Sequence, residues 1–448
     1  MKNILSQTLI VAIILFITAC TPSEKQKVIA LASAMENSMK SEVLDKWYPL
    51  NVDTVYGGFL STFTFDFKPT GDQDKMIVTQ SRHTWSNSKA AKLYPNESQY
   101  LNNAKHGFKF LRDVMWDKDF GGFYWLVDRQ GKPKATDTLK TAYGNAFGIF
   151  ALAAYYDASG DTAALGLAKN AFWWLEEKSH DPKHLGYFQH LMRDGTPVLR
   201  ATGTPSKSDL GYKDQNSSIH LLEAFTELYL VWPDSLLRER LNEMLILIRD
   251  TITTPRGSLT LFLSPSWRPV SFQDSSKQVV LEHSNLDHIS FGHDVETAFL
   301  LLEASQTLGI KNDTTTERVA KRMMDHALGN GWDDSIGGFY DEGYYFKGEP
   351  SLTITRDSKN WWAQAECMNT LLLMAEKYPN DELHYYLKFE KQWDYCNTYL
   401  IDHENGDWFA GGLDKQPEMK TALKGNIWKG NYHQFRSLMH CIERLRKL

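Results

Sequence analysis

A motif of two glycines and an aromatic residue recurs along the chain and constrains its organisation. Clear copies are Tyr56-Gly57-Gly58-Phe59, Phe120-Gly121-Gly122-Phe123 and Ile336-Gly337-Gly338-Phe339, and looser ones are Leu185-Gly186-Tyr187-Phe188, Pro255-Arg256-Gly257-Ser258 and Ala410-Gly411-Gly412-Leu413. Successive copies lie 64 to 80 residues apart. A period of that length holds two helices and a connection. Because glycine tolerates positive φ, each copy is predicted to form a small hairpin or turn.

Between these motifs, apolar residues recur with helical spacing, as at Ala146, Ile149, Phe150 and Ala153. Each interval contains one apolar run, a break and a second run. The first runs predict helices over Tyr143–Tyr156, Asn216–Val231, Gly292–Leu308, Trp361–Ala375 and Tyr432–Leu445. The second runs predict helices over Tyr100–Trp116, Asp161–Glu177, Leu236–Thr251, Thr316–Leu328 and Glu382–Tyr399.

Six helix pairs without a strand-rich half cannot each bury an apolar face alone, but they can do so in a closed ring. The sequence therefore predicts an all-α fold, an (α/α)6 barrel of six helical hairpins with the glycine turns at one end. Residues Lys25–Trp47 are predicted to form the outer helix that pairs with the C-terminal helix and closes the ring. Residues 27–448 are expected to form one catalytic domain.

The N-terminus has the pattern of an export signal. Lys2 is followed by the apolar run Leu9–Ala19, which is too short to span a bilayer but suits a signal-peptide core. The segment Ile17-Thr18-Ala19-Cys20 resembles a bacterial lipobox. It predicts cleavage of residues 1–19, lipid attachment at Cys20 and a tether over residues 20–26. The alternative is an ordinary secretory signal with an incidental cysteine.

This pattern predicts a protein of the bacterial cell envelope, held by the lipid anchor alone. The outer membrane is the expected site, with the protein facing either the periplasm or the cell surface. The chain carries 49 Lys and Arg against 55 Asp and Glu, and no strongly basic run, so it lacks the charge of a nucleic-acid binder. The remaining cysteines, Cys367, Cys396 and Cys441, are odd in number and do not indicate a disulfide framework.

Polar residues gather at the starts of the predicted inner helices, which all face one mouth of the barrel. One such group occurs in each repeat. The groups are Arg82 and Trp85; Lys140 and Tyr143; Asn216, His220 and Glu223; His293, Asp294 and Glu296; Lys359, Trp361, Trp362, Gln364 and Glu366; and Trp428, Tyr432, His433 and Arg436. Aromatic residues make up 13% of the chain and supply flat faces on which sugars stack.

Two imidazoles at this mouth predict proton-transfer chemistry. His293 and His433 come from different repeats, so they are expected to face a substrate from different sides, where one removes a proton and the other returns one. Arg82 is suited to hold a developing oxyanion. Glu296 lies one helical turn after His293 and is expected to orient that ring or to bind a hydroxyl. This inventory favours proton abstraction next to a carbonyl over hydrolysis.

Several segments resemble the N-acylglucosamine 2-epimerase superfamily, and within it the cellobiose 2-epimerases most. The resemblance covers about residues 40–448. The segments that carry it are Ser290-Phe291-Gly292-His293-Asp294-Val295-Glu296, Lys359-Asn360-Trp361-Trp362-Ala363-Gln364-Ala365-Glu366, Trp428-Lys429-Gly430-Asn431-Tyr432-His433-Gln434-Phe435-Arg436, Asn216-Ser217-Ser218-Ile219-His220 with Glu223, and Lys140-Thr141-Ala142-Tyr143 with Phe147.

The resemblance implies an (α/α)6 barrel that inverts C2 of a ring-opened reducing aldose through a cis-enediolate, without a cofactor. It implies that His293 and His433 are the acid–base pair, that His220 assists ring opening or holds the substrate, and that Arg82 stabilises the enediolate. The residues that it implies for binding hydroxyls or stacking are Tyr143, Asn216, Glu296, Trp362, Glu366 and Trp428. The expected substrate is a glucose- or mannose-type aldose, free or in a disaccharide.

Three other functions remain open. An aldose–ketose isomerase of mannose type would use a similar histidine pair and deliver the proton to C1. A glycoside hydrolase would need a carboxylate pair at a defined separation, for which Asp341 or Glu342 with Glu366 are the candidates. A sugar-binding lipoprotein would keep the aromatics but need no positioned histidines. The assembly is expected to be a monomer or a homodimer.

No metal site is expected. His283, His288 and His293 recur every five residues, and this spacing does not place three ligands on one helix face. His180, His184 and His190 lie in a predicted loop.

Overall fold

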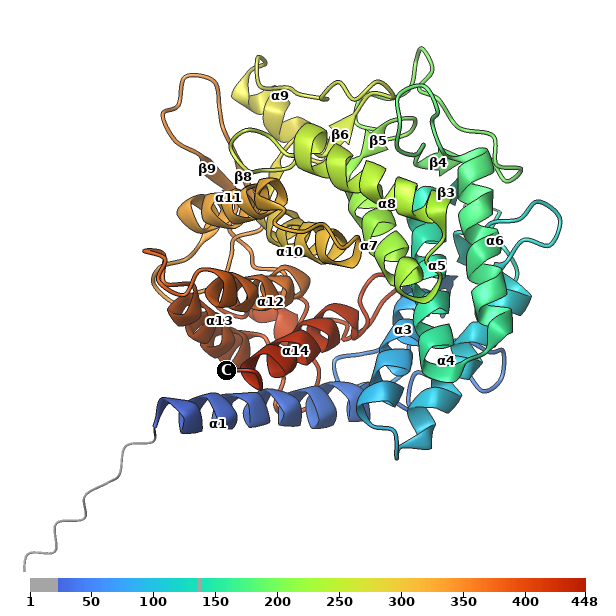
Figure 1. Ribbon diagram of the computed structural model, residues 1–448, viewed down its shortest axis with the longest axis horizontal. Helices are drawn as coiled ribbons and strands as arrows, with labels where there is room; N and C mark the ends of the chain where they lie inside the picture. The colour runs from blue at the N-terminus through green and yellow to red at the C-terminus, as the bar shows by residue number, and fades with distance from the viewer. Residues whose placement is uncertain (1–22, 136–137) are drawn as a thin grey trace, which may run out of the picture.

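Six helices line the inside of a closed ring and are buried on nearly every side. In the computed structural model, which describes residues 23–135 and 138–448, each packs against the next around the ring, and the last packs against the first (Figure 1). They are α3 (Ile77–Leu93), α5 (Ala142–Ser159), α7 (Gln215–Val231), α10 (Phe291–Thr307), α12 (Trp361–Lys377) and α14 (Tyr432–Leu445). The fold is the predicted (α/α)6 barrel.

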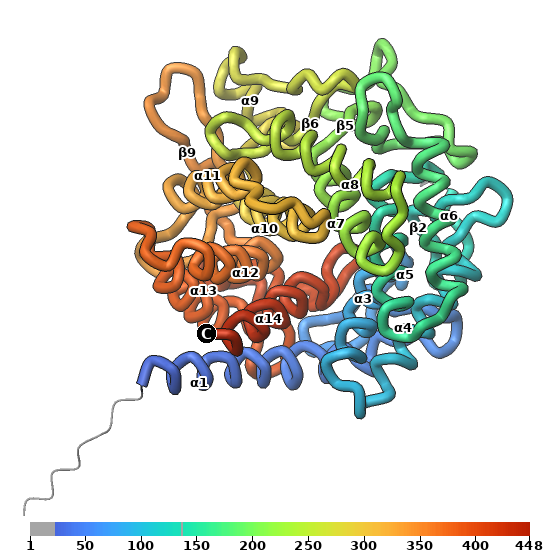
Figure 2. Tube along the Cα trace, in the orientation of Figure 1, coloured from blue at the N-terminus to red at the C-terminus, as the bar shows by residue number. Residues whose placement is uncertain are grey.

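A second set of helices wraps the ring, one against each inner helix. These are α4 (Ser98–Phe110), α6 (Thr162–Lys178), α8 (Ser235–Leu247), α11 (Thr314–Gly331), α13 (Tyr385–Tyr399) and, from the N-terminus, α1 (Glu24–Asn37) with the short α2 (Asp45–Trp47). The π-helical segments Ser38–Leu44, Leu111–Met115 and Ile248–Ile252 extend three of them. Figure 2 shows the chain travelling once around the ring, so that α1 lies beside α14 and closes it as predicted.

Each predicted helix is present, and its ends agree with the prediction to within three residues when the π-helical segments are included. The helix α1 begins at Glu24, after a capping box formed by Ser23 and Gln26, so residues 24–26 form its first turn rather than part of a tether. The predicted signal peptide and Cys20 lie outside the described residues. No helix in the described part of the chain is long and apolar enough to cross a membrane.

Short antiparallel strands lead into four of the inner helices. β1 (Lys75–Met76) pairs with β2 (Leu126–Val127), β3 (Lys140–Thr141) with β4 (His190–Leu191), and β5 (Lys213–Asp214) with β6 (Phe262–Leu263). β7 (Ile289–Ser290), β8 (Glu342–Tyr344) and β9 (Thr353–Arg356) form a three-stranded sheet, and the short helix α9 (Lys277–Glu282) precedes it. These strands fix the direction in which each inner helix enters the ring.

Two of the glycine turns pack closely against aromatic residues of the outer helices. Gly122 has φ +69°, and a Cβ there would lie 2.8 Å from the Trp174 ring of α6. Gly58 has φ +66°, and a Cβ there would lie 2.8 Å from Phe110 of α4. Both positions therefore need a residue without a side chain, for backbone and for steric reasons.

Buried lysine–aspartate pairs join these turns to the segments that precede the inner helices. They are Lys75–Asp53, Lys140–Asp117, Lys213–Asp181, Lys359–Asp333 and Lys424–Asp402, with Nζ to carboxylate distances of 2.8 to 2.9 Å. Lys140 and Lys359, which the sequence places among the polar residues of the mouth, are thus occupied by ion pairs in the barrel wall. The repeat that carries His293 has Ile289 and Thr254 at the corresponding positions.

Cys367, Cys396 and Cys441 are buried free thiols within the described residues. They pack in the core, as the odd number of cysteines suggests.

Candidate active site at the mouth of the barrel

The first two turns of the inner helices place their lumen-facing side chains around one cavity. On a helix, residues three or four apart share a face, so the second or third residue and the sixth residue point the same way. The residues that line the cavity, whose volume is about 180 Å³, are Arg82, Tyr143, Asn216, His220, His293, Glu296, Trp361, Trp362, Trp428 and His433. The structure thus brings together nine of the ten residues to which the sequence assigns a catalytic or binding role, and with them Trp361, which the sequence places at the mouth without a role.

Glu366, the tenth, lies behind His433 and has no exposed surface. Its Oε1 accepts a hydrogen bond of 2.7 Å from Nδ1 of His433. Burial and the neighbouring Arg82 lower the pKa of His433 well below 6.5, so its imidazole is neutral. A neutral ring that donates from Nδ1 has its lone pair on Nε2, which makes Nε2 a base.

His293 has a different, uncharged partner. Its Nδ1 shares a hydrogen bond of 2.8 Å with Oγ of Ser290, the residue just before α10. Burial, with repulsion from His220 and other histidines, lowers the pKa of His293 to about 3. Its ring centroid lies 4.7 Å from the Trp362 indole, and that of His433 lies 5.8 Å from the same indole. The two imidazoles therefore flank one aromatic wall, and both are neutral.

His220 is held by an acidic residue on its own helix. Its Nδ1 is 2.8 Å from Oε2 of Glu223, and its ring packs against Phe147 and Tyr143. Burial raises the pKa of Glu223, but Arg436 and His220 outweigh it and bring the value to about 2. Glu223 is therefore ionised, and His220 is oriented as a hydrogen-bonded imidazole.

Arg82 places a permanent cation in the cavity. Its guanidinium lies 4.7 Å from the centroid of the Phe147 ring and 5.0 Å from that of Tyr432, and it donates to the backbone oxygen of Trp428. It also approaches the Tyr143 hydroxyl, at 3.4 Å. Burial raises the pKa of Tyr143 to about 12, so that hydroxyl is a neutral donor. Arg82 and Tyr143 together can stabilise negative charge on a ligand oxygen.

Two residues near the site are missed by the sequence reasoning. Trp125 lies 5.9 Å, between ring centroids, from Trp428, which is 47% exposed at the rim. Ser290 is three residues before His293, and its position just before a predicted helix could have suggested a contact with that ring. The sequence pattern does not single out Trp125, because this residue lies in a turn and not at the start of a predicted inner helix.

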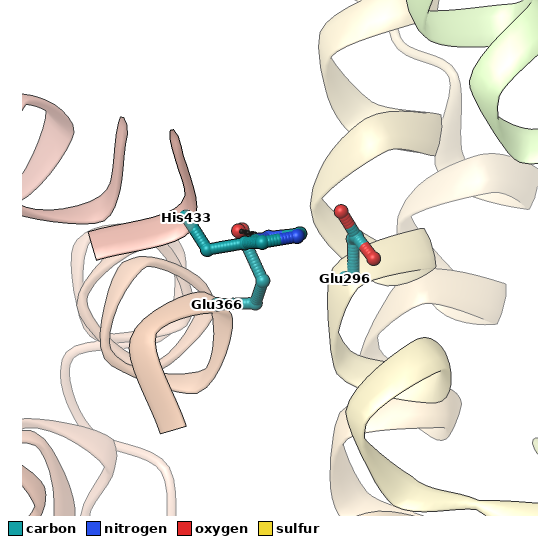
Figure 3. Close-up of side chains that lie close together, drawn as sticks. All are labelled: Glu296, Glu366 and His433. Carbon is teal, nitrogen blue, oxygen red and sulfur yellow. Dashed lines mark hydrogen bonds and ion pairs between the residues drawn. The ribbon is translucent and has the colours of Figure 1, made fainter. Parts of the chain in front are cut away.

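Glu296, Glu366 and His433 form a cluster in which one ligand atom from each lies within 4.8 Å of the others (Figure 3). Such a set has the chemistry of a divalent-cation site. Here the guanidinium of Arg436 already pairs with both carboxylates, and Nδ1 of His433 donates to one of them. The negative charge of the cluster is therefore offset in part by a cationic side chain of the protein itself.

The carboxylates considered for hydrolysis are engaged elsewhere. Asp341 accepts hydrogen bonds from the backbone and side chain of Asn360, and Glu342 pairs with Arg356 at 2.8 Å. Neither lines the cavity. With Glu366 bound by His433, the site offers no free pair of carboxylates across it among the residues that line the cavity. The arrangement suits proton removal and return next to a carbonyl.

Comparisons with known proteins agree with this chemistry. A model of the N-acylglucosamine 2-epimerase (GlcNAc 2-epimerase) family matches residues 57–437. The chain is 29% identical over 426 residues to a cellobiose 2-epimerase of Ruminococcus albus, covering 92% of this chain and 99% of that protein. It is 23% identical over 340 residues to a D-mannose isomerase of Thermobifida fusca, covering 75% and 76%. The structure is similar to that of cellobiose 2-epimerase from Bacillus thermoamylovorans B4167, with a TM-score of 0.80, 26% identity, and 93% and 100% of the two chains covered.

Proposed function

The chain belongs to the N-acylglucosamine 2-epimerase family, and starting from that membership, which makes it a carbohydrate isomerase, we propose that it inverts C2 of a reducing-end aldose. The proposed substrates are glucose- and mannose-type sugars, free or at the reducing end of a disaccharide. The observation that carries the proposal is the presence of two neutral imidazoles, His293 and His433, in one cavity that also holds Arg82.

The reaction begins on the ring-opened sugar, whose C1 carbonyl makes the C2 proton acidic. Nε2 of one histidine removes this proton, and the resulting enediolate places its negative charge beside Arg82 and the Tyr143 hydroxyl. That charge raises the proton affinity of the second imidazole, which takes up a proton from solvent and delivers it to the opposite face of C2. The first histidine then releases the abstracted proton to solvent, so both rings return to the neutral state. His220, fixed by Glu223, is placed to hold the C1 oxygen or to assist ring opening.

The cavity has room for a single sugar unit at the reacting position. Its volume of about 180 Å³ is below the range of about 300–1,000 Å³ that is common for larger ligands. A second sugar unit would lie outside it, against the exposed indole of Trp428. Asn216, Glu296 and Trp362 are proposed to bind hydroxyls or to stack within it. The proposal differs from the sequence-based expectation at Glu366, which is assigned to orient His433 rather than to contact sugar.

The experiment is proton NMR in D2O with cellobiose, mannose, glucose and N-acetylglucosamine as separate substrates. Epimerisation puts deuterium at C2 and produces the epimer. His293→Phe and His433→Phe are expected to remain folded and to lose exchange, while His106→Phe, at a histidine outside the cavity, serves as the control. Bond cleavage without C2 exchange, or full turnover by either site variant, would refute the proposal.

An aldose–ketose isomerase is the second candidate, and the relationship to a D-mannose isomerase favours keeping it. The same enediolate gives a ketose when the proton is delivered to C1. The NMR experiment separates the two outcomes, because the epimer shows an anomeric proton at C1, whereas the anomeric carbon of the ketose is C2 and carries no proton.

We also propose that the mature protein is lipid-anchored through Cys20 in the cell envelope, where it meets oligosaccharides rather than phosphorylated sugars. This proposal rests on the sequence before Ser23. Membrane fractionation of the full chain and of Cys20→Ala tests it. The variant is expected to leave the membrane fraction, and equal membrane association of both forms would contradict the proposal.

A further inference from the structure

One arginine beneath the cavity binds carboxylates from three different inner helices. Arg436 of α14 pairs with Glu223 of α7, Glu296 of α10 and Glu366 of α12. It is 2% exposed and does not line the cavity. The hydroxyl of Tyr432 completes the group, because it lies 2.6 Å from both the guanidinium and Glu223. Arg436 is therefore out of reach of a substrate but in contact with the groups that orient the histidines.

Two of these carboxylates each accept a hydrogen bond from Nδ1 of a histidine. Glu223 accepts from His220 at 2.8 Å, and Glu366 accepts from His433 at 2.7 Å. We propose that Arg436 is a positioning residue that holds both carboxylates as hydrogen-bond acceptors and thereby fixes the tautomer in which Nε2 of His433 is unprotonated. This inference rests on the proposed function, in which Nε2 of His433 is a base.

The physical basis is the burial of these carboxylates. Burial raises the pKa of Glu366 above its ordinary value of 4.5 even with Arg436 in place, and the guanidinium of Arg436, with Nη2 at 2.8 Å, is the largest influence that holds this rise down. The same guanidinium is the largest influence that lowers the pKa of Glu223. An uncompensated buried charge is strongly unfavourable, so a carboxyl that loses this cation takes up a proton.

Protonation of Glu366 would reverse the hydrogen bond to His433. A carboxylic acid has an O–H that donates, and Nδ1 of the imidazole would then accept. The ring proton would move to Nε2, where it faces the substrate. In that tautomer the ring has no lone pair toward C2 and cannot remove a proton. The substitution would therefore impair the base while leaving the cavity lining in place.

The test compares Arg436→Met with a control on the same helix, Arg444→Met. Arg444 pairs with Glu376 at 2.6 Å near the far end of α14, away from the histidines. The main readout is ¹⁵N NMR of the imidazole nitrogens at neutral pH, assigned with His433→Phe and His220→Phe. This readout needs no substrate, so it is independent of whether the protein acts on any of the sugars tested.

In the wild-type protein and in Arg444→Met, His433 is expected to show protonated Nδ1 and bare Nε2. In Arg436→Met, His433 is expected to show protonated Nε2. C2 exchange should fall by at least about 10²-fold, the typical contribution of a general base, with KM changed little. Because Arg436→Met removes a buried cation, Arg436→Ala with added guanidinium serves as the second variant, and the guanidinium should restore the wild-type tautomer and part of the activity.

An unchanged His433 tautomer in folded Arg436→Met, or in folded Arg436→Ala without guanidinium, would overturn the inference. An equal fall in activity in Arg444→Met would overturn it as well, since it would point to a general loss of structure. Failure of the proposed function is recognised separately, by absence of C2 exchange in the wild-type protein while its imidazole nitrogens still respond as described.

Discussion

Replacement of Glu366 by glutamine tests how much the charge behind His433 contributes to the reaction. Oε1 of Glu366 accepts from Nδ1 of His433 at 2.7 Å and faces Nη2 of Arg436 at 2.8 Å. The other oxygen, Oε2, is buried without a partner among the described residues. An amide oxygen at the first position accepts both donors, and the NH2 group falls where Oε2 was. Glu366→Gln therefore preserves size and hydrogen bonding but removes the negative charge.

In the proposed reaction, that charge acts when His433 holds the proton taken from C2. Two unit charges about 4 Å apart attract by about 4 kcal/mol at an effective dielectric constant of about 20. The amide dipole retains part of this, so the imidazolium loses roughly 3–4 kcal/mol of stabilisation. Each 1.4 kcal/mol is a factor of ten in rate, which predicts a fall in kcat of about 10² to 10³-fold.

The assay is the rate of C2 deuterium exchange in D2O under saturating sugar, with Glu376→Gln, a carboxylate at the far end of the same helix, as the matched control. KM is expected to change by less than about threefold, because Glu366 has no exposed surface. A kcat within threefold of the wild-type value in Glu366→Gln would refute the reasoning, and so would a rise in KM with kcat unchanged.

Three further predictions concern pH and stability. Because the pKa of His293 is lowered to about 3, the ring stays neutral as the pH falls from 7 to about 5, and kcat/KM should stay flat over that interval; a loss of half the activity near pH 6.5 would contradict the assigned environment. Lys213→Met leaves the buried carboxylate of Asp181 unpaired and should lower the free energy of unfolding by about 3–5 kcal/mol in urea titrations, whereas adding Asp181→Leu should recover part of the loss. Gly122→Ala should cost about 1–3 kcal/mol in the same assay, since its Cβ would meet Trp174 at a positive φ, and a loss below about 0.5 kcal/mol would show that the turn can adapt.

The fold can be predicted from the sequence because its repeat is punctuated by glycine turns and its inner helices are mostly apolar. The helix α3 is the exception. It buries a nearly continuous run of polar residues from Thr79 to Ser88, interrupted by Trp85, so apolar periodicity does not reveal its bounds. The π-helical segments also escape prediction, because they change the hydrogen-bond pattern of a helix without changing the spacing of its apolar residues.

The mouth residues can be predicted because equivalent positions in a ring of inner helices meet at one end. What the sequence does not show is which polar residues turn inward. Lys140 pairs with Asp117 in the wall, while Arg82 enters the cavity, and both appear in the sequence as a cation near the start of a helix. The placement of Glu366 behind His433 depends likewise on side-chain packing between α12 and α14, which apolar spacing does not record.

The repeat that carries His293 lacks the buried lysine–aspartate pair found in the other five repeats. This difference affects which substitutions the enzyme can tolerate. In five repeats, replacing only the lysine or only the aspartate leaves the other buried charge without a partner. Such single substitutions therefore lower the stability of the fold. Ile289 and Thr254 carry no such constraint, and the chain between the glycine turns of this repeat is also the longest, at 80 residues. Under the proposed function, laboratory variation of sugar preference is therefore best begun in residues 264–288, where insertions and substitutions alter the segment that leads into α10 and His293 without breaking a buried lysine–aspartate pair.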